Sequence, residues 1–259
     1  MSPEYKASQI EMDDIERTIV NFARSKTSKD VAAVVVPPTI VEANFCRTGE
    51  QQTFDKLGEG YDFAEGMAPY ESSSVFLYTV NTEHGRIAHA KRLVHANVDN
   101  RTDGLTGIEP IDDRLTAGEE SERADLDTIL RDSDLTMDSL RTVVNVATNF
   151  TTRRLSPKTT KVPYATLSYL SVFKYVTDAS RGRNAAAILA YLNSAAKDSL
   201  GRIKVESRLL GGKPFHLPKS DGSGYDERYE AVVIPDSRRN KAIFTTMGRF
   251  VGIPVIDYK

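Results

Sequence analysis

The sequence contains very little cysteine and lacks the ligand spacing of a metal site. Cys46 is the one cysteine among 259 residues, so no disulfide can form within the chain, which fits a protein of the reducing cytoplasm. Zinc sites use ligands at short paired spacings. His84 and His89 are five residues apart, which places them on one face of neither a helix nor a strand. We therefore expect no bound metal.

An excess of positive charge and long apolar runs are also missing. Lys and Arg number 34 against 36 Asp and Glu, for a formal net charge of −2. Proteins that coat nucleic acid need a basic excess, so we do not expect a nucleic-acid partner of that kind. The strongest early apolar run, VAAVVV at 31–36, is too short to cross a bilayer, and the N-terminus lacks the apolar region of a secretory signal. We expect a cytoplasmic protein without a membrane partner.

The first half of the chain carries both helix and strand patterns. Ile15, Ile19 and Phe22 recur at helical spacing, and the turn sequence at 83–85 separates two β-rich runs. Along the chain we expect a helix over 10–25, a buried strand over 31–36, an irregular loop over 47–70, hairpin strands over 75–80 and 86–95, an acidic insertion over 99–138, and a helix from about 138 to 149. The insertion reads as a solvated segment, with an acidic interaction face as the alternative.

The second half is expected to finish the same sheet. The apolar run 162–176 predicts a long buried strand. Gly201 is expected to end the helix over 185–198, because glycine is common just past the last turn of a helix. The expected elements are a basic loop over 153–161, a strand over 162–176, a helix over 185–198, strands over 202–210 and 229–235, a helix over 239–251 and a final strand near the C-terminus. The order predicts a mixed α/β (α+β) architecture, organised as a single domain over 1–259 with the insertion at about 99–138.

The stretch SRGRNAAAILAYL, at 180–192, raises a specific functional question. If a helix begins here, its first N–H groups have no intrahelical partners and favour an anion. Gly182 permits positive φ, Asn184 tolerates it, and Arg181 and Arg183 are suited to phosphate. The alternative is an ordinary surface helix capped by a preceding residue such as Ser180. Both interpretations remain open from the residues alone.

RGRNAA resembles the acyl-CoA pyrophosphate loop of the GNAT (GCN5-related N-acetyltransferase) superfamily, whose pattern is Arg/Gln-x-x-Gly-x-Gly/Ala. Arg181 stands at the first position and Ala186 at the last, but Asn184 replaces the usual glycine, which weakens the wrapping of a pyrophosphate. The order of elements around the motif is similar to the family's over about 5–35, 74–96 and 160–259. The acyl-amino-acid and homoserine-lactone synthase branch is similar in layout and also carries insertions.

The resemblance implies a central twisted, mostly antiparallel sheet flanked by helices. It also implies acyl transfer from acetyl-CoA or another acyl-CoA to an amine of a small molecule or a protein. Tyr169 would be the acid that protonates the leaving thiolate, and Glu206 the base that takes the proton of the amine. The co-substrate would contact the backbone near Val172 and Phe173, and its pyrophosphate loop would comprise Arg181, Gly182, Arg183, Asn184, Ala185 and Ala186.

Several alternatives stand beside this hypothesis. Glu206 could simply pair with Arg208 or Lys204 at a sheet edge, and Cys46 has no identifiable histidine partner to make it a nucleophile. The protein could be a catalytically inactive module of the same fold that binds a ligand or a protein. It could also bind a nucleotide or nucleic acid through its basic loops, whose residues are Arg153, Arg154, Lys158, Arg181 and Arg183.

Overall fold

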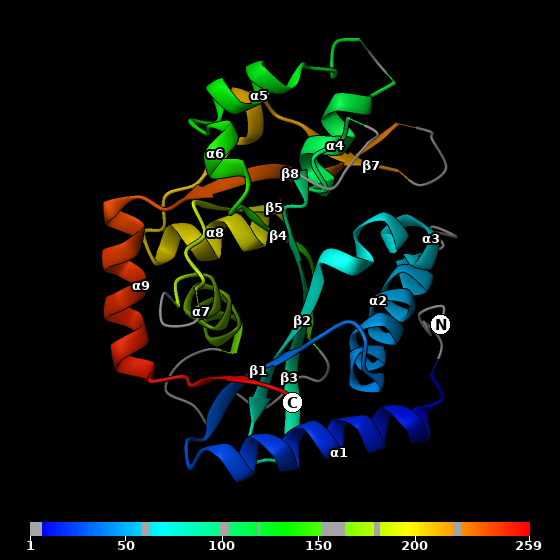
Figure 1. Cartoon of the computed structure of the whole chain (residues 1–259), viewed down its shortest axis with the longest axis vertical. Helices are drawn as coiled ribbons and strands as arrows, with labels where there is room; N and C mark the ends of the chain where they lie inside the picture. The colour runs from blue at the N-terminus through cyan, green and yellow to red at the C-terminus, as the bar shows by residue number, and fades with distance from the viewer. Residues whose placement is uncertain are drawn as a thin grey trace. The chain divides into compact units, whose positions relative to one another are not determined.

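The computed structural model describes residues 7–57, 63–98, 104–118, 120–151, 164–178, 182–219 and 224–259 (Figure 1). The chain forms two compact units. Unit 1 comprises residues 1–93, 148–178 and 246–259, and unit 2 comprises residues 94–147 and 179–245. The expectation of one domain over 1–259 stays a prediction. In the described part of the chain, no helix combines the length and apolar character needed to cross a membrane.

Unit 1 is built on a sheet with the strand order β4-β3-β2-β1-β9, of which β4 (Val144–Thr151) contributes its second half. β1 pairs antiparallel with β2, and its other edge pairs parallel with β9. The elements are α1 (Gln9–Lys26), β1 (Val31–Val36), α2 (Asn44–Leu57), α3 (Phe63–Met67), β2 (Ser74–Asn81), β3 (Arg86–His95), α7 (Tyr164–Val176) and β9 (Val255–Asp257). The predicted first helix, first strand, hairpin and last strand are confirmed.

Local chemistry explains why α1 forms where the sequence predicts a helix. The Ser8 hydroxyl accepts the Glu11 N–H at 3.3 Å, while the Glu11 carboxylate accepts the Ser8 N–H at 2.6 Å, which is a capping box. Ile15 and Ile19 are buried on one face. At the other end, the Arg24 Nε donates to the carbonyl oxygen of Thr82 at 2.7 Å, which ties the helix to the β2–β3 turn.

The two faces of the unit 1 sheet are covered by different helices. Phe76 and Tyr78 of β2 pack in one apolar cluster with residues of α1 and α2. Thr79, which directly follows Tyr78, faces α7 instead: the Lys91 Nζ donates to Thr79 Oγ1 at 3.1 Å, and the Thr79 hydroxyl donates to Ser171 Oγ at 3.2 Å. Figure 1 shows α2 and α7 on opposite sides of β2. Period-two alternation along β2 therefore separates an apolar face from a partly polar one.

A glycine in α2 makes room for an aromatic ring. A Cβ atom at Gly49 would overlap the Phe150 ring, so Gly49→Ala forces the ring to move and is expected to destabilise the protein by about 1–3 kcal/mol. Gly201→Ala in α8 (Ser194–Arg202) is the matched control, because no atom lies within 4 Å of its added methyl group and helix propensity favours alanine by up to about 1 kcal/mol. Urea unfolding of both variants measures the difference. If Gly49→Ala is neutral, or Phe150→Leu gives it no relief, the ring does not fill this space.

Unit 2 contains a sheet with the order β6-β8-β5-β4, with β7 also paired to β8. β5 lies between β4, which is parallel, and β8, which is antiparallel. The elements are α4 (Glu109–Thr116), α5 (Leu126–Asp132), α6 (Met137–Leu140), β4 (Val144–Thr151), β5 (Ala187–Asn193), α8 (Ser194–Arg202), β6 (Arg208–Leu209), β7 (His216–Pro218), β8 (Tyr225–Pro235) and α9 (Arg238–Val251). The strand predicted over 229–235 and the helix predicted over 239–251 are confirmed.

The acidic insertion is not simply a solvated segment. Ile108, Ile111 and Ile129 are fully buried and pack with Ala187 and Leu189 of β5 in one core cluster. Figure 1 shows α4, α5 and α6 together on one side of β5 and β8. The apolar residues of the insertion are spaced widely among acidic ones, so the composition of the segment does not predict that its helices form a layer over one face of the sheet.

Three other sequence predictions were wrong about the type or extent of the element. The loop expected over 47–70 contains α2 and α3, and the helix expected at about 138–149 is the short α6 followed by β4. The strand expected over 202–210 is reduced to the two residues of β6. Each error falls where the local signal was short or mixed, so nonlocal packing decided the structure.

The two errors that matter most for function surround the RGRNAA motif. The strand expected over 162–176 is the helix α7, and the helix expected over 185–198 is β5 followed by α8. A run that is apolar on nearly all sides has no period, so it cannot separate a buried helix from a buried strand. Alanine favours a helix, but β5 pairs with neighbours on both edges and its first four residues are buried. That nonlocal pairing overrides the propensity.

Candidate functional site

The predicted pyrophosphate loop follows a helix and leads into a strand, the reverse of the expected order. Gly182 adopts φ of +70° and is exposed. Among the described residues other than glycine, positive φ occurs at Asp134 and Lys204, so Asn184 does not take the left-handed shape that a glycine there could supply. Arg181 lies outside the described residues. The strand–loop–helix geometry on which this prediction rested is therefore absent, while CoA binding by the stretch stays a prediction.

The end of this stretch is anchored at the start of β5. Ala185 is buried, the Ala186 N–H donates to Thr142 Oγ1 at 3.3 Å, and the Ala186 carbonyl accepts the Asp236 N–H at 2.9 Å. These bonds engage both backbone groups of Ala186 with unit 2 itself. A phosphate ligand of this residue would have to replace or share them.

Arg183 lies near a histidine of the same unit. Burial lowers the pKa of His95, and the positive charge of Arg183 lowers it further. Arg183 is half-buried, so its charge acts where water screens it poorly. The neighbourhood of Arg183 and His95 is therefore electropositive, which is the physical requirement for an anionic group.

Three of the predicted site residues lie in the helix α7 rather than in a strand. Val172 and Phe173 are buried inside a helix, where each N–H is directed at the carbonyl oxygen four residues earlier rather than at a ligand. The expectation that they supply strand-like backbone groups to a thioester therefore loses its structural basis. Tyr169 is half-buried, and burial raises the pKa of its hydroxyl. Its role as an acid stays a prediction.

Glu206 stabilises the beginning of α9 instead of lying within a strand. Its carboxylate accepts the Ser237 hydroxyl at 2.8 Å and the Arg239 guanidinium at 3.4 Å. Its backbone exchanges two hydrogen bonds with the Asn240 amide, at 2.8 and 3.0 Å. The alternative interpretation as an ion-paired residue thus gains a partner, Arg239, which the sequence analysis did not name. A role as general base stays a prediction.

The parallel strands β4 and β5 separate within unit 2. Their pairing covers three positions and ends with Val146 opposite Ala190. β5 continues to Asn193 with β8 still paired on its other edge, and Tyr191 to Asn193 are half-buried. We call the point where the pairing of β4 and β5 stops the β4–β5 fork. Past it, that edge of β5 pairs with no strand in the described part of the chain, so an edge of this kind suits an extended polar ligand.

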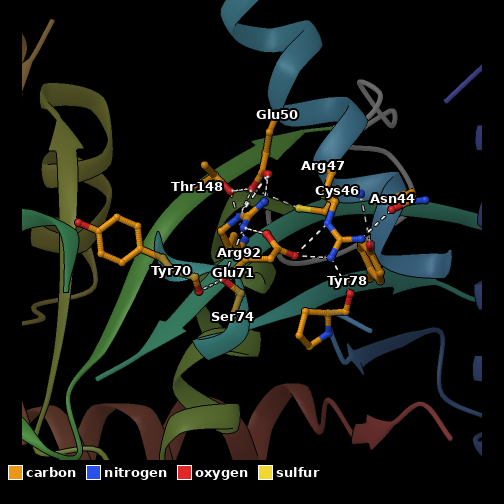
Figure 2. Close-up of polar contacts among 11 residues, drawn as sticks. Asn44, Cys46, Arg47, Glu50, Tyr70, Glu71, Ser74, Tyr78, Arg92 and Thr148 are labelled. Atoms are coloured by element: carbon orange, nitrogen blue, oxygen red, sulfur yellow. Dashed lines mark hydrogen bonds and ion pairs between the residues drawn. The ribbon is translucent and has the colours of Figure 1, made fainter. Parts of the chain in front are cut away.

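Unit 1 contains a network of buried charges that the sequence analysis missed (Figure 2). Arg92 is fully buried; its Nη2 donates to Glu50 Oε2 at 2.7 Å and its Nη1 to Glu71 Oε2 at 2.6 Å. Arg47 also binds Glu71 and donates to Asn44 Oδ1 at 2.6 Å. Figure 2 shows the two arginines reaching Glu71 from different elements. The two positive and two negative groups balance, which is the condition for burying them.

The surroundings of this network make it rigid. Both guanidinium groups lie over the Phe76 ring, with Cζ at 5.1 Å for Arg47 and 4.9 Å for Arg92. Burial alone would raise the pKa of Glu71, but the charge of Arg92 and the hydrogen bonds from both arginines outweigh it and lower that pKa. The network therefore links α2 with β2 and β3, and its arginine N–H groups bind acceptors within unit 1.

Cys46 belongs to the same region and is a poor nucleophile. Its Sγ donates to Glu50 Oε1 at 3.7 Å, and the thiol is fully buried. Burial raises the pKa of the thiol well above its ordinary value, and the negative charge of Glu50 adds to this effect. Because the thiolate is the reactive form, Cys46 is inert in this state.

No pattern in the sequence predicts that these residues lie together. Arg47 and Glu50 are three apart on α2, but Glu71 and Arg92 come from distant segments, and ion pairs across that separation leave no local pattern. Within the described residues, no group of three or more His, Cys, Asp or Glu side chains is arranged to hold a metal ion.

Comparisons with known proteins identify the class of fold. No protein-family model matches the sequence, and no curated protein matches it. The structure is similar to solved acyl-homoserine lactone synthases, and the chain has the mixed α/β fold of that GNAT-like class, with a large, mostly antiparallel sheet flanked by helices.

The particular structures can be named. BjaI, a CoA-dependent acyl-homoserine lactone synthase solved with MTA, has a TM-score of 0.50 at 11% identity, over 88% of this chain and 93% of that chain. BjaI with SAM and isopentyl-CoA gives 0.49 at 11% identity, with the same coverage. TofI in an apo form gives 0.45 at 15% identity, over 83% and 96%. At 11% identity, the similarity to BjaI with MTA establishes the fold alone.

Proposed function

We propose that this protein is an acyl-CoA-dependent acyltransferase that moves an acyl group to an amine of a small molecule or a protein. The observation that carries the proposal is the β4–β5 fork, in a chain that shares the fold of a CoA-dependent acyl-homoserine lactone synthase. A fork of this kind exposes one edge of a strand in an otherwise continuous sheet. The amide groups of a pantetheine arm have the spacing and polarity to pair with such an edge.

The edge of β5 would also assist the chemistry. A backbone N–H directed at the thioester carbonyl stabilises the negative charge that develops on its oxygen when the amine attacks. The new C–N bond forms as the C–S bond breaks, and the sulfur leaves as a thiolate that must take up a proton. Residues of β5 past Ala190 replace Val172 and Phe173 as the proposed backbone donors.

The phosphates of CoA need positive charge, and Arg183, which lies near His95, supplies it in unit 2. A bound anion would stabilise the imidazolium form of His95, opposing the effect of Arg183, and so raise the pKa of His95. We therefore keep the segment from Gly182 to Ala186 as the proposed region for the phosphates, with Arg183 as its main contact.

Coenzyme A is expected to stabilise the protein against heat. At a ligand concentration about 100 times Kd, mass action adds about 2.7 kcal/mol, which corresponds to roughly 5–10 °C in Tm for a chain of this size. Arg183→Glu should abolish most of the shift. Arg131→Glu is the matched control, because it makes the same charge change on an exposed side chain of α5 in the same unit. In the wild type, NMR should show the pKa of His95 rising when CoA is added.

The same measurement separates the alternatives. If neither coenzyme A nor acetyl-CoA nor a long-chain acyl-CoA shifts Tm, the acyltransferase proposal fails. A shift with an oligonucleotide alone, lost at high salt, would favour a nucleic-acid binder. Binding of acyl-CoA without thiol release in the presence of any amine would favour an inactive binding module.

A further inference from the structure

A carboxylic acid and a phenol meet at the β4–β5 fork. Asp113 lies on α4, in the acidic insertion, and Tyr191 directly follows Ala190, the last β5 residue that pairs with β4. The Tyr191 hydroxyl donates to Asp113 Oδ2 at 2.7 Å. Both side chains are half-buried, so a ligand can reach them. The insertion thus brings a carboxyl group to the point in the sheet where the proposed thioester would react.

The two neighbouring aspartates of α4 are in different environments. Asp112 is buried and accepts hydrogen bonds from the Thr106 N–H at 2.6 Å, the Thr106 hydroxyl at 2.7 Å and the Gly107 N–H at 3.0 Å, which favour its ionised form. Among the described residues, Asp113 accepts a side-chain hydrogen bond from the Tyr191 hydroxyl alone. Burial raises the pKa of Asp113, the Tyr191 hydrogen bond lowers it and the charge of Asp112 raises it, and together these effects bring it from 3.8 to about 7. Of the two, Asp113 is the one suited to exchange a proton near neutral pH.

The other charged groups nearby do not neutralise Asp113. Arg114, next on α4, directs its guanidinium at the carbonyl oxygens of Leu210 and Lys213 and stacks on the Phe215 ring at 5.5 Å. Arg114 interacts electrostatically with Tyr191 and with Glu122 and Asp132. On β8, Glu230 is paired with Lys197 of α8 at 2.7 Å. Within the described residues Asp113 has no ion-pair partner, so a cationic ligand could take that place.

We propose that Asp113, held by Tyr191, binds the ammonium group of the acyl acceptor and takes up one of its protons, an inference that rests on the proposed acyltransferase function. The ammonium gives one proton to the Asp113 carboxylate, which leaves a neutral amine and a carboxylic acid. The lone pair of the amine forms the C–N bond to the thioester carbon, and the C–S electron pair leaves on sulfur. The second proton lost from nitrogen goes to the thiolate, so the products are an amide and a free thiol.

The first test needs no turnover. The carboxyl NMR signal of Asp113 in the full-length protein is assigned by its loss in Asp113→Asn. Its chemical shift is then followed against pH with butylamine or butanol added. We expect butylamine to lower the apparent pKa of Asp113 by about one unit, because its ammonium favours the carboxylate, and butanol to leave it unchanged. Asp134→Asn, the same change at an exposed aspartate of unit 2, should behave as the wild type. A pKa of Asp113 indifferent to butylamine overturns the proposal.

The second test uses the pH dependence of thiol release from acyl-CoA with an amine acceptor. In the wild type, kcat/KM should rise with pH through about 7, as Asp113 becomes the carboxylate that accepts a proton. Asp113→Asn should lower kcat/KM about 100-fold or more. Asp113→Glu, which keeps a carboxyl group, should keep part of the wild-type kcat/KM. Tyr191→Phe should move the inflection to higher pH, because it removes the hydrogen bond that favours the carboxylate.

The outcomes separate this inference from the function on which it rests. If the wild type binds CoA and forms amide while Asp113→Asn keeps both the rate and the pH profile, Asp113 is not the proton acceptor and the acyltransferase proposal stands. If CoA does not bind the wild type at all, the acyltransferase proposal fails, and the response of Asp113 to butylamine alone decides whether the amine site exists.

Discussion

Arg92→Met is expected to destabilise the protein by about 3–5 kcal/mol, the usual cost of breaking a buried ion pair by removing one partner. Arg92 is fully buried, and its loss leaves the Glu50 carboxylate, also buried, without its bidentate partner. Glu71 would keep Arg47, so most of the cost should come from Glu50. Urea unfolding at neutral pH measures the change.

Two companion variants make the prediction specific. Arg131→Met makes the same substitution at an arginine whose side chain is 70% exposed, and it should change stability by less than about 1 kcal/mol. Adding Glu50→Gln to Arg92→Met removes the orphaned charge and should recover part of the loss. If Arg92→Met is as mild as Arg131→Met, or Glu50→Gln brings no recovery, the network does not contribute as its geometry implies.

Lys91→Met is expected to stabilise the protein, by on the order of 4 kcal/mol near pH 6. Lys91 is 1% exposed, and its amine donates to Thr79 Oγ1. Burial lowers the pKa of the amine from 10.5 to about 7. Below about pH 7 the folded protein must hold a buried cation, and methionine removes that cost while it fills a similar volume.

The pH dependence of this effect has a definite sign. Between about pH 7 and 10.5 the unfolded chain holds a proton on Lys91 that the folded chain has lost, so stability should rise with pH in this range. From pH 7 to 9 the wild type should gain about 2–3 kcal/mol from this group. The window ends at pH 9 because the raised pKa of Cys46 gives the opposite slope above it.

Denaturant unfolding between pH 6 and 9 tests both statements. The advantage of Lys91→Met should shrink as the pH rises, and the slope assigned to this lysine should vanish in the variant. Lys174→Met, at an exposed position of α7, is the matched control and should leave the slope unchanged. A Lys91→Met variant that is less stable than the wild type at pH 6 would show that the buried amine is favourable there.

Sequence reasoning succeeded where one segment carries its own structural signal. The capping residues and helical spacing before Ser25 define α1, and the turn at Gly85, which has φ of +64°, joins two strand patterns. The candidate site was harder to predict. Asp113 and Tyr191 are 78 residues apart, and nothing in either segment indicates that they meet. Glu206 was noticed as a carboxylate, but its partners on α9 could not be read from its neighbours.

The sequence alone determined the fold class, because alternation, capping and apolar spacing are local properties that survive in any arrangement of the chain. Tertiary structure decided whether the segments before and after RGRNAA are helices or strands. Tyr164–Val176 forms the helix α7, which packs against the rest of the protein on nearly all its sides. Ala187–Asn193 is a strand because β4 and β8 pair with its two edges. Those contacts come from residues far away in the chain, and their free energy exceeds the weak helix preference of alanine. The fork at Ala190, and with it the proposed site, exists because of that pairing.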